Sequence, residues 1–296
     1  MSDARPVAMI GLGIMGSAMS RNLIEAGFTV YGVDPAPAAR QTFREMGGRL
    51  VETAAEAAAR ADILLTCLPS AAALHAVVDD LAAAPPGDRV LAETSTLTLA
   101  DKEQARDALA ALGITMLDCP LSGSGSQAKT RDVLVYGSGP VEAWNRCLPV
   151  FHGFSRGPHH LGVFGNGSRM KYVANLLVAI HTVAAGEAFA LARKAGLDPA
   201  QMFEVVADGA GGSRAMQVRG GMLIADRYRP VETMPLDLWR KDLKVIAEFA
   251  TEVGCPTPMF AACSALFQAA IASGYGDQDT AAVALVSEGL AGLGRK

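Results

Sequence analysis

The stretch Val7 to Gly16, with sequence VAMIGLGIMG, decides the fold of the first half of this chain. Its apolar start, Val7 to Ile10, predicts a short buried strand. The glycines at positions 11, 13 and 16 match G-x-G-x-x-G, and helical periodicity follows from Ser17 to Ala26. In a strand–turn–helix unit these glycines permit a tight turn, close approach of the backbone to a pyrophosphate, and close packing of helix on strand. The stretch therefore predicts a dinucleotide site in which the helix N-terminus binds the phosphates. The expected cofactor-binding positions are Gly11, Leu12, Gly13, Ile14, Met15 and Gly16.

An acidic residue follows the second predicted strand, Thr29 to Val33. Asp34 lies 18 positions after Gly16 (34 minus 16), where a carboxylate bonds the adenosine ribose and disfavours the extra phosphate of NADP. The nearest basic residue on the C-terminal side is Arg40. The sequence therefore favours NAD as the cofactor, with NADP as the less favoured choice.

Short apolar runs alternate with Ala-rich helical patterns through the first half of the chain. Further strands are expected at Ile63 to Cys67, Val90 to Glu93 and Ile114 to Cys119, with Asp132 to Tyr136 as another candidate. A helix is expected at Asp101 to Leu112. This alternation predicts a mostly parallel sheet with helices on both faces, an α/β Rossmann-type domain over residues 1–164.

The pattern changes after Gly165, where long Ala- and Leu-rich segments are separated by turn signals. Asn166, Gly167 and Ser168 are good helix-capping residues for a long helix that runs to about Ala195. No strand is predicted there. Residues 165–296 are therefore expected to form an all-α domain for substrate binding and oligomerisation.

Composition narrows the range of partners and compartments. The chain has 296 residues, with 26 basic and 30 acidic ones and a net charge of −4, which argues against nucleic acid or an anionic membrane as the main partner. The apolar stretch Leu176 to Ala192 contains His181 and Glu187, which favours a buried helix over a membrane span. Residues 1–6 lack the pattern of a signal peptide. The cysteines form no CxxC pair and no metal spacing, so we expect reduced, mostly buried thiols in a cytoplasmic protein: Cys67, Cys119, Cys147, Cys255 and Cys263.

Several dehydrogenase chemistries can be tested against the residue spacing. No tyrosine has a lysine four positions later, as short-chain dehydrogenases require. The pair His159-His160 has no partner at zinc-ligand spacing and is interpreted as part of a loop, so no metal site is expected. Residue spacing alone does not exclude a dehydrogenase that uses a His–Asp pair as its base. A flavin enzyme could use the same glycine loop, but the second half shows no flavin signature.

One constellation follows the predicted domain junction. Lys171 and Asn175 are four positions apart, so they share one face of the predicted helix. Their neighbours are largely apolar, which is an unfavourable place for a lysine without a task. A lysine acts as a base only in its neutral form, and apolar surroundings favour that form. The alternative interpretation is a solvent-facing helix lysine.

With these motifs in place, the chain resembles the 3-hydroxyacid (β-hydroxyacid) dehydrogenase family over nearly its whole length. The resemblance implies a 6-phosphogluconate dehydrogenase-like fold, a small hydroxy acid substrate, and a homodimer or homotetramer. The matching blocks are Gly11 to Gly16, Cys67-Leu68-Pro69, Glu93-Thr94-Ser95-Thr96, Asp118-Cys119-Pro120-Leu121-Ser122-Gly123, the helix with Lys171 and Asn175, Arg240-Lys241-Asp242-Leu243, and Gly276-Asp277-Gln278-Asp279.

The resemblance also implies roles for the matching positions. Lys171 would be the catalytic general acid/base, and Asn175 would hold the substrate and orient Lys171. Ser122 and Gly123 would bind the substrate carboxylate. The remaining implied contacts are Thr96, where nicotinamide and substrate meet, Leu68 and Pro69 along the dinucleotide, and Lys241 on the cofactor.

Two departures from the family pattern bear on the substrate. Ser124 stands where the family commonly has a second glycine, and its hydroxyl is available to a polar substrate. The segment Gly125 to Asp132 also departs from the usual glycine-rich run. Candidate substrates are a 3-hydroxy acid, a tartronate-related acid or a sugar acid such as threonate. The alternatives are an imine reductase, which the presence of Lys171 disfavours, and a catalytically silent redox sensor, which has no need for Lys171.

Overall fold

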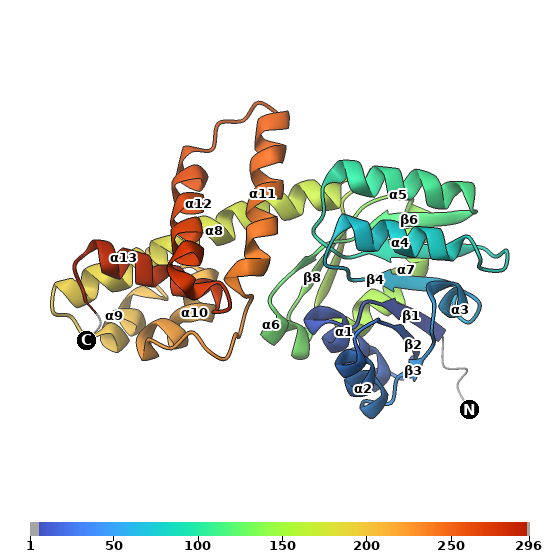
Figure 1. Ribbon diagram of the computed structural model, residues 1–296, viewed down its shortest axis with the longest axis horizontal. Helices are drawn as coiled ribbons and strands as arrows, with labels where there is room; N and C mark the ends of the chain where they lie inside the picture. The colour runs from blue at the N-terminus through green and yellow to red at the C-terminus, as the bar shows by residue number, and fades with distance from the viewer. Residues whose placement is uncertain (1–5, 295–296) are drawn as a thin grey trace. The chain divides into compact units, whose positions relative to one another are not determined.

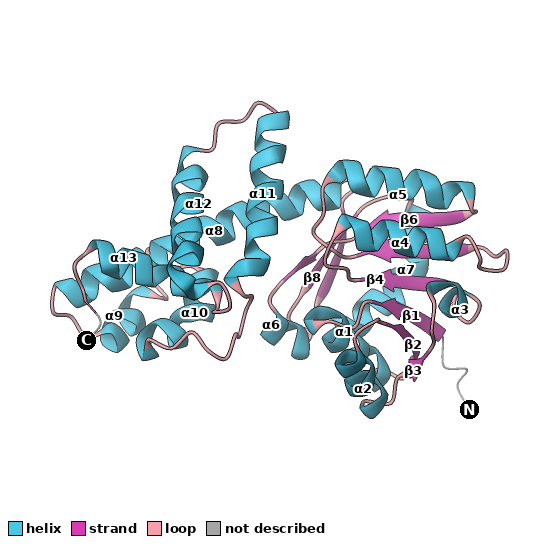
Figure 2. Cartoon of the chain, in the orientation of Figure 1, coloured by secondary structure: helices cyan, strands magenta, loops and turns pink. Residues whose placement is uncertain are grey.

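The computed structural model describes residues 6–294, and the chain divides between Lys171 and Tyr172 into two compact units. Figure 1 shows the chain from its blue N-terminal strands to its red C-terminal helices. All strands of the described residues lie in the first unit, while the second is helical (Figure 2). This is the α/β-then-α organisation that the sequence predicts.

The first unit is built on a six-stranded sheet in which every neighbouring pair is parallel. In the strand order β3-β2-β1-β4-β5-β6, the chain adds strands on one side of β1 and then, from β4 onward, on its other side. Ligands bind at such a switch point, at the carboxyl ends of the strands. The strands are β1 (Pro6–Ile10), β2 (Thr29–Val33), β3 (Arg49–Leu50), β4 (Ile63–Thr66), β5 (Arg89–Glu93) and β6 (Ile114–Asp118).

Alternating side chains of the strands build two separate cores, one on each face of the sheet. From β1, Val7 and Met9 join the core that includes residues of α1 and α7. Ala8 and Ile10 join the opposite core, which includes residues of α3, α4 and α5. Strands buried on both faces explain the continuous apolar runs of the sequence. The helices are α1 (Ile14–Glu25), α2 (Pro37–Glu45), α3 (Ala54–Ala58), α4 (Ala71–Leu81), α5 (Leu99–Ala111) and α7 (Val141–Phe154).

A second, three-stranded sheet follows β6 and was only partly predicted. It consists of β7 (Leu121–Ser122), β8 (Leu134–Gly137) and β9 (Gly157–His160), with the short α6 (Gly125–Lys129) between β7 and β8. The candidate strand at Asp132 to Tyr136 is β8, shifted by two residues at its start. The loop interpretation of His159-His160 is wrong, because both residues pair in β9. Two-residue strands such as β3 and β7 are too short to show periodicity.

The second unit consists of helices around their own apolar core. The long helix α8 (Asn166–Lys194) begins in the first unit and contributes Tyr172, Ala179, Val183 and Phe189 to the core of the second. By length and composition alone α8 could cross a membrane, a test that core helices also pass. The other elements are α9 (Pro199–Val206), α10 (Arg214–Ala225), α11 (Leu236–Glu252), α12 (Pro258–Ala270), the π-helix η1 (Ile271–Tyr275), the 3₁₀-helix η2 (Thr280–Val283) and α13 (Ala284–Leu290).

Candidate active site

The glycine loop joins β1 to α1 and leaves room for a phosphate at one position. Gly11 has φ +95°, and a Cβ there would lie 2.2 Å from the carbonyl oxygen of Cys67. A Cβ at Gly16 would lie 1.9 Å from the carbonyl oxygen of Gly11, so helix and loop pack too closely for any side chain. Gly13 is exposed, and apart from its own neighbours in the chain no atom of the described residues lies within 4 Å of its Cβ position. The loop is therefore closed at Gly11 and Gly16 and open at Gly13, which fits the backbone approach of a dinucleotide pyrophosphate.

Asp34 follows β2 and has a second task besides the one expected from sequence. Its Oδ2 accepts a hydrogen bond from the backbone N–H of Leu12 at 2.7 Å, and its Oδ1 accepts one from Ala36 at 2.7 Å. The carboxylate thus holds the glycine loop against the end of β2. Two carboxylate oxygens offer about four acceptor sites, so capacity for ribose hydroxyls remains.

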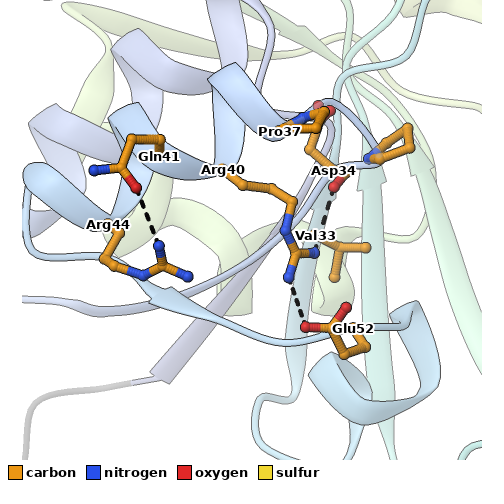
Figure 3. A pocket seen from close by; sticks show the side chains of 8 residues that line it. Val33, Asp34, Pro37, Arg40, Gln41, Arg44 and Glu52 are labelled. Carbon is orange, nitrogen blue, oxygen red and sulfur yellow. Dashed lines mark hydrogen bonds and ion pairs between the residues drawn. The ribbon is translucent and has the colours of Figure 1, made fainter.

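An open pocket of about 660 Å³ lies beside Asp34 and is shown in Figure 3. Arg40 crosses it, with its guanidinium 2.5 Å from Glu52 Oε1 and 3.5 Å from the carbonyl oxygen of Asp34. Arg44, from the next turn of α2, donates to Gln41 at 3.1 Å. The pocket is therefore lined by two arginines, Arg40, which is the nearest basic residue after Asp34 in the sequence, and Arg44, to which sequence reasoning assigned no role. The one beside Asp34 is already paired with a carboxylate.

The loops after β4 and β5 are tied to each other. The backbone N–H of Leu68 donates to Ser95 Oγ at 2.7 Å, and the N–H of Ser95 donates to Glu93 Oε1 at 2.9 Å. Pro69 is exposed and Thr96 is partly exposed beside this connection. These candidates therefore gather at the same carboxyl edge of the sheet as the glycine loop and Asp34.

The expected substrate loop, Ser122 to Ser124, runs from the last residue of β7 to the N-cap of α6. Gly123 has φ +145°, and a Cβ there would lie 2.6 Å from Val133 Cγ1, so the position requires glycine. Ser124 is the N-cap of α6: its Oγ accepts from the N–H of Gln127 at 3.4 Å, and its own N–H donates to Gln127 Oε1 at 3.0 Å. The hydroxyl that sequence offered to a substrate is thus also part of a capping box.

The start of α8 is anchored to the carboxyl end of β6. Ser168 donates twice to Asp118, from its N–H to Oδ2 at 2.7 Å and from its Oγ to Oδ1 at 2.8 Å. The N–H of Gly167 donates to Ser138 Oγ at 2.9 Å. Lys171 lies one turn further along α8 and is the last residue of the first unit. The candidate acid/base is therefore carried by a helix turn that is bonded to the sheet.

Asn175 and Lys241, both in the second unit, converge on a carboxylate to which sequence reasoning assigned no role. Asn175 Nδ2 donates to Asp242 Oδ2 at 3.0 Å, and Lys241 Nζ lies 3.3 Å from Asp242 Oδ1. Asp242 is buried on α11. It orients the Asn175 amide, and the available signal was its place beside Lys241 in a recognised block.

A buried lysine on α5 was also missed. Lys102 is fully buried, with Nζ 2.7 Å from Glu93 Oε2 and 2.8 Å from Asp118 Oδ1. Burial by itself lowers the pKa of Lys102, but the two carboxylates outweigh it and raise that pKa above its ordinary value. The signal available in the sequence was the pair of acidic residues ending two neighbouring parallel strands, which calls for a cation between them.

Family comparisons agree with this architecture. Residues 6–165 match the NAD binding domain of 6-phosphogluconate dehydrogenase, and residues 165–287 match the NAD-binding domain of NADP-dependent 3-hydroxyisobutyrate dehydrogenase. The chain belongs to the 3-hydroxyacid dehydrogenase family. It is an oxidoreductase that uses NAD or NADP on a hydroxy acid.

Individual relatives cover almost the whole chain. An L-threonate dehydrogenase of Cupriavidus necator is 32% identical over 97% of this chain and 97% of its own. A 2-(hydroxymethyl)glutarate dehydrogenase of Eubacterium barkeri is 30% identical over 99% and 98%. The crystal structure of a 3-hydroxyisobutyrate dehydrogenase from Salmonella typhimurium superposes with a TM-score of 0.87 at 30% identity, covering 95% of this chain and 99% of that one. The fold expected from sequence is therefore confirmed, whereas these relatives act on different hydroxy acids.

Proposed function

We propose that this protein oxidises a small hydroxy acid with NAD, using Lys171 as the general acid/base. The observation that carries the proposal is the start of α8. The helix begins at the carboxyl end of β6, in the same parallel sheet whose β1–α1 turn is the glycine loop, and Lys171 follows one turn later. Nucleotide loop and lysine thus belong to one compact unit.

The residues of the chain have separate tasks in this reaction. The glycine loop, Asp34 and the Leu68–Pro69 segment would hold the dinucleotide, and when bound its nicotinamide accepts a hydride from the substrate carbon. Ser122 and Gly123 would bind the substrate carboxylate. As the C–H bond breaks and the C=O bond forms, neutral Lys171 takes the hydroxyl proton. In the reverse direction its ammonium form returns that proton to the alkoxide oxygen.

NAD is the preferred cofactor in this proposal because of the charges around the pocket beside Asp34. A 2′-phosphate would meet the Asp34 carboxylate, and the cation beside it, Arg40, is paired with Glu52. Binding the phosphate would require Arg40 to exchange one anion for another. Arg44 is exposed and bonded to Gln41, which leaves NADP a weaker second ligand.

A polyhydroxylated acid of the threonate type is the first candidate substrate. Relatives at 32% and 31% identity are L-threonate dehydrogenases. Three serines, Ser122, Ser124 and Ser126, line the segment around β7 and α6, and their hydroxyls suit a substrate rich in hydroxyl groups. Oxidation of such an acid at the carbon next to its carboxylate would give a 2-oxo acid.

The test is turnover of L-threonate, 3-hydroxyisobutyrate and 2-(hydroxymethyl)glutarate, each with NAD⁺ and with NADP⁺, by the wild type and Lys171→Ala. We expect kcat/KM highest with L-threonate and NAD⁺. Loss of the general acid/base should lower kcat by about 10²–10⁴-fold while the dissociation constant for NADH stays unchanged. Lys194→Ala, at the far end of α8, is the matched control and should keep wild-type rates.

Two outcomes would contradict the proposal. Near-normal turnover by Lys171→Ala with every accepted acid would remove Lys171 from the chemistry. Reduction of a cyclic imine such as 1-pyrroline, without turnover of any hydroxy acid, would point to C=N chemistry on the same fold.

A further inference from the structure

A buried cluster of three charged groups links two strands to α5. Glu93 and Asp118 end β5 and β6 and are register partners in the parallel sheet. Lys102 lies between them, with Nζ 2.7 Å from the Glu93 carboxylate and 2.8 Å from that of Asp118. All three side chains are 0% exposed. An ion cluster of this kind contributes little stability by itself, which points to another role that it performs.

The charges of the cluster do not cancel, and the surplus faces α8. Two carboxylates and one ammonium leave a net charge of −1. Asp118 directs both of its oxygens at the first turn of α8, where it accepts from the N–H and the Oγ of Ser168. The N-terminus of a helix carries a partial positive charge of about +0.5 and unpaired N–H groups. The surplus negative charge and the helix start therefore complement each other.

Close packing makes this contact rigid. A Cβ at Gly167 would lie 2.2 Å from the carbonyl oxygen of Tyr136 and 2.7 Å from that of Asp118. Ser138 Oγ donates to Asp118 Oδ2 at 3.2 Å and accepts from the N–H of Gly167. The first turn of α8 thus lies directly on the backbone of the neighbouring strands and has no room to shift.

The cluster reaches the cofactor side through Glu93. Glu93 Oε1 accepts from the N–H of Ser95, and Ser95 Oγ accepts from the N–H of Leu68. Thr96 is the next residue along the chain. One continuous set of contacts therefore runs from the loops after β4 and β5 through Lys102 and Asp118 to the turn that precedes Lys171.

We propose that Asp118 is a positioning residue, which fixes the first turn of α8 and thereby aims Lys171 at the carboxyl edge of the sheet. The proposal rests on the function proposed above for Lys171. Asn cannot replace Asp118, because its amide NH₂ would face a donor, either the N–H of Ser168 or the ammonium of Lys102. A misplacement of about 1 Å at a reacting group costs about 100-fold in rate.

The first experiment needs neither substrate nor cofactor. Hydrogen–deuterium exchange of the amides of residues 167–171 is compared between the wild type and Asp118→Asn. We expect at least tenfold faster exchange in the variant, with strand β1 unchanged. Unchanged exchange at residues 167–171 would overturn the anchoring, whatever the protein catalyses.

The second experiment is a kinetic cycle of Asp118→Asn, Lys171→Ala and the double variant, with NAD⁺ and the fastest acid of the panel above. Asp118→Asn should lower kcat about 10- to 100-fold with KM for NAD⁺ changed less than threefold. In the Lys171→Ala background the same substitution should change kcat less than twofold, because its effect passes through Lys171. Equal losses in both backgrounds would overturn the proposal.

Two further variants protect these tests. If Asp118→Asn does not fold, Ser168→Ala takes its place, since it removes one of the two Ser168 bonds and keeps the charge. It should lower kcat about two- to fivefold and show the same dependence on Lys171; an unchanged kcat would overturn the proposal. Glu288→Gln, which breaks a partly buried ion pair with Arg193 in the second unit, is the control and should leave exchange at 167–171 unaltered. Should Lys171→Ala be fully active while Asp118→Asn speeds exchange, the function proposed for Lys171 fails and the anchoring stands.

Discussion

Two helices start at the carboxyl edge of the same sheet, and their first turns are treated in opposite ways. At α1 the N-cap is Gly13, which has no side chain to offer to the free N–H groups, and space is open around it. At α8 the corresponding N–H groups are bonded within the protein: the N–H of Gly167 donates to Ser138, and the N–H of Ser168 donates to Asp118. Both starts attract negative charge for the same reason, the partial positive charge of a helix N-terminus.

The difference separates a ligand site from a structural joint. An open helix start beside a glycine turn can take the phosphates of a dinucleotide. A helix start occupied by the protein's own carboxylate cannot bind an external anion and instead determines the position of whatever the next turn carries. Here that is Lys171.

The largest effect is expected from removing the cation of the ion cluster that holds the start of α8. Lys102→Met would leave Glu93 and Asp118 side by side and buried without their cation. We expect the free energy of unfolding to fall by about 3–5 kcal/mol, measured by urea unfolding. Lys244→Met is the matched control on an exposed i,i+4 pair with Glu248 and should change it by less than about 0.5 kcal/mol. Equal stability of both variants would mean that the buried carboxylates of Glu93 and Asp118 do not depend on the Lys102 ammonium.

The open N-terminus of α1 is tested by two glycine-to-alanine substitutions, which add the same methyl group at different positions. Gly13→Ala adds a methyl group where the phosphates would lie, so NAD⁺ affinity should fall about tenfold, equivalent to about 1.4 kcal/mol. The melting temperature without cofactor should not change, because among residues 6–294 no atom beyond the chain neighbours lies within 4 Å of that Cβ. Gly16→Ala, whose Cβ would lie 1.9 Å from the Gly11 carbonyl oxygen, should lower both stability and affinity. Calorimetric titration and thermal unfolding distinguish them, and unaltered NAD⁺ binding by Gly13→Ala would contradict the site.

The smallest expected effect is the loss of folding stability at alkaline pH, to which Lys102 beside the start of α8 contributes. The pKa of Lys102 is raised in the folded protein, so above the ordinary value of 10.5 the unfolded chain loses a proton that the folded one keeps. Stability is then lost as pH rises, by at most about 1.4 kcal/mol per pH unit. Burial raises the pKa of Cys147 to about 12 and produces the same sign from pH 9 upward.

Urea unfolding between pH 8 and 11.5 separates these two contributions. Cys147→Ala should reduce the loss of stability from pH 9 upward without abolishing it, because burial also raises the pKa of Cys119 and Cys263. Lys102→Met should change the slope only above pH 10.5. The same slope in wild type and both variants would contradict this assignment.

Local patterns were sufficient for the elements that carry the nucleotide. The strand–glycine–helix unit at β1 and α1, and Asp34 after β2, follow from spacing, because each task is performed by residues close together in the chain. The long helix α8 was predicted to end within a residue of its true end, since its apolar pattern is continuous. The sequence did not predict the short strands β3 and β7, because two residues show no periodicity. It also did not predict that His159-His160 pair in β9, because Gly-Pro-His-His resembles a loop.

The side chains that hold the site escaped prediction for a different reason. Lys102 lies between Asp101 and Glu103 on an Ala-rich helix, a pattern typical of a solvated face, yet it is fully buried. Arg40 was judged distant from Asp34 by sequence spacing, but the turn into α2 brings its guanidinium to the Asp34 carbonyl and to Glu52. Asp242 meets Asn175 from 67 positions away. Such pairings depend on how elements pack, which one-dimensional spacing does not encode.

By itself the sequence determined the parallel nucleotide-binding sheet, the helical second half and the candidate residues, because hydrophobic periodicity and glycine requirements act over short stretches of chain. Only the tertiary structure decided which carboxylates are already occupied. Asp34 closes the glycine loop while keeping acceptor sites for a ribose, whereas Asp118, charged and fully buried 50 positions before Ser168, is bound by Lys102 and the start of α8. The physical reason is that a buried charge must find its partner in space, and that partner can come from any part of the chain.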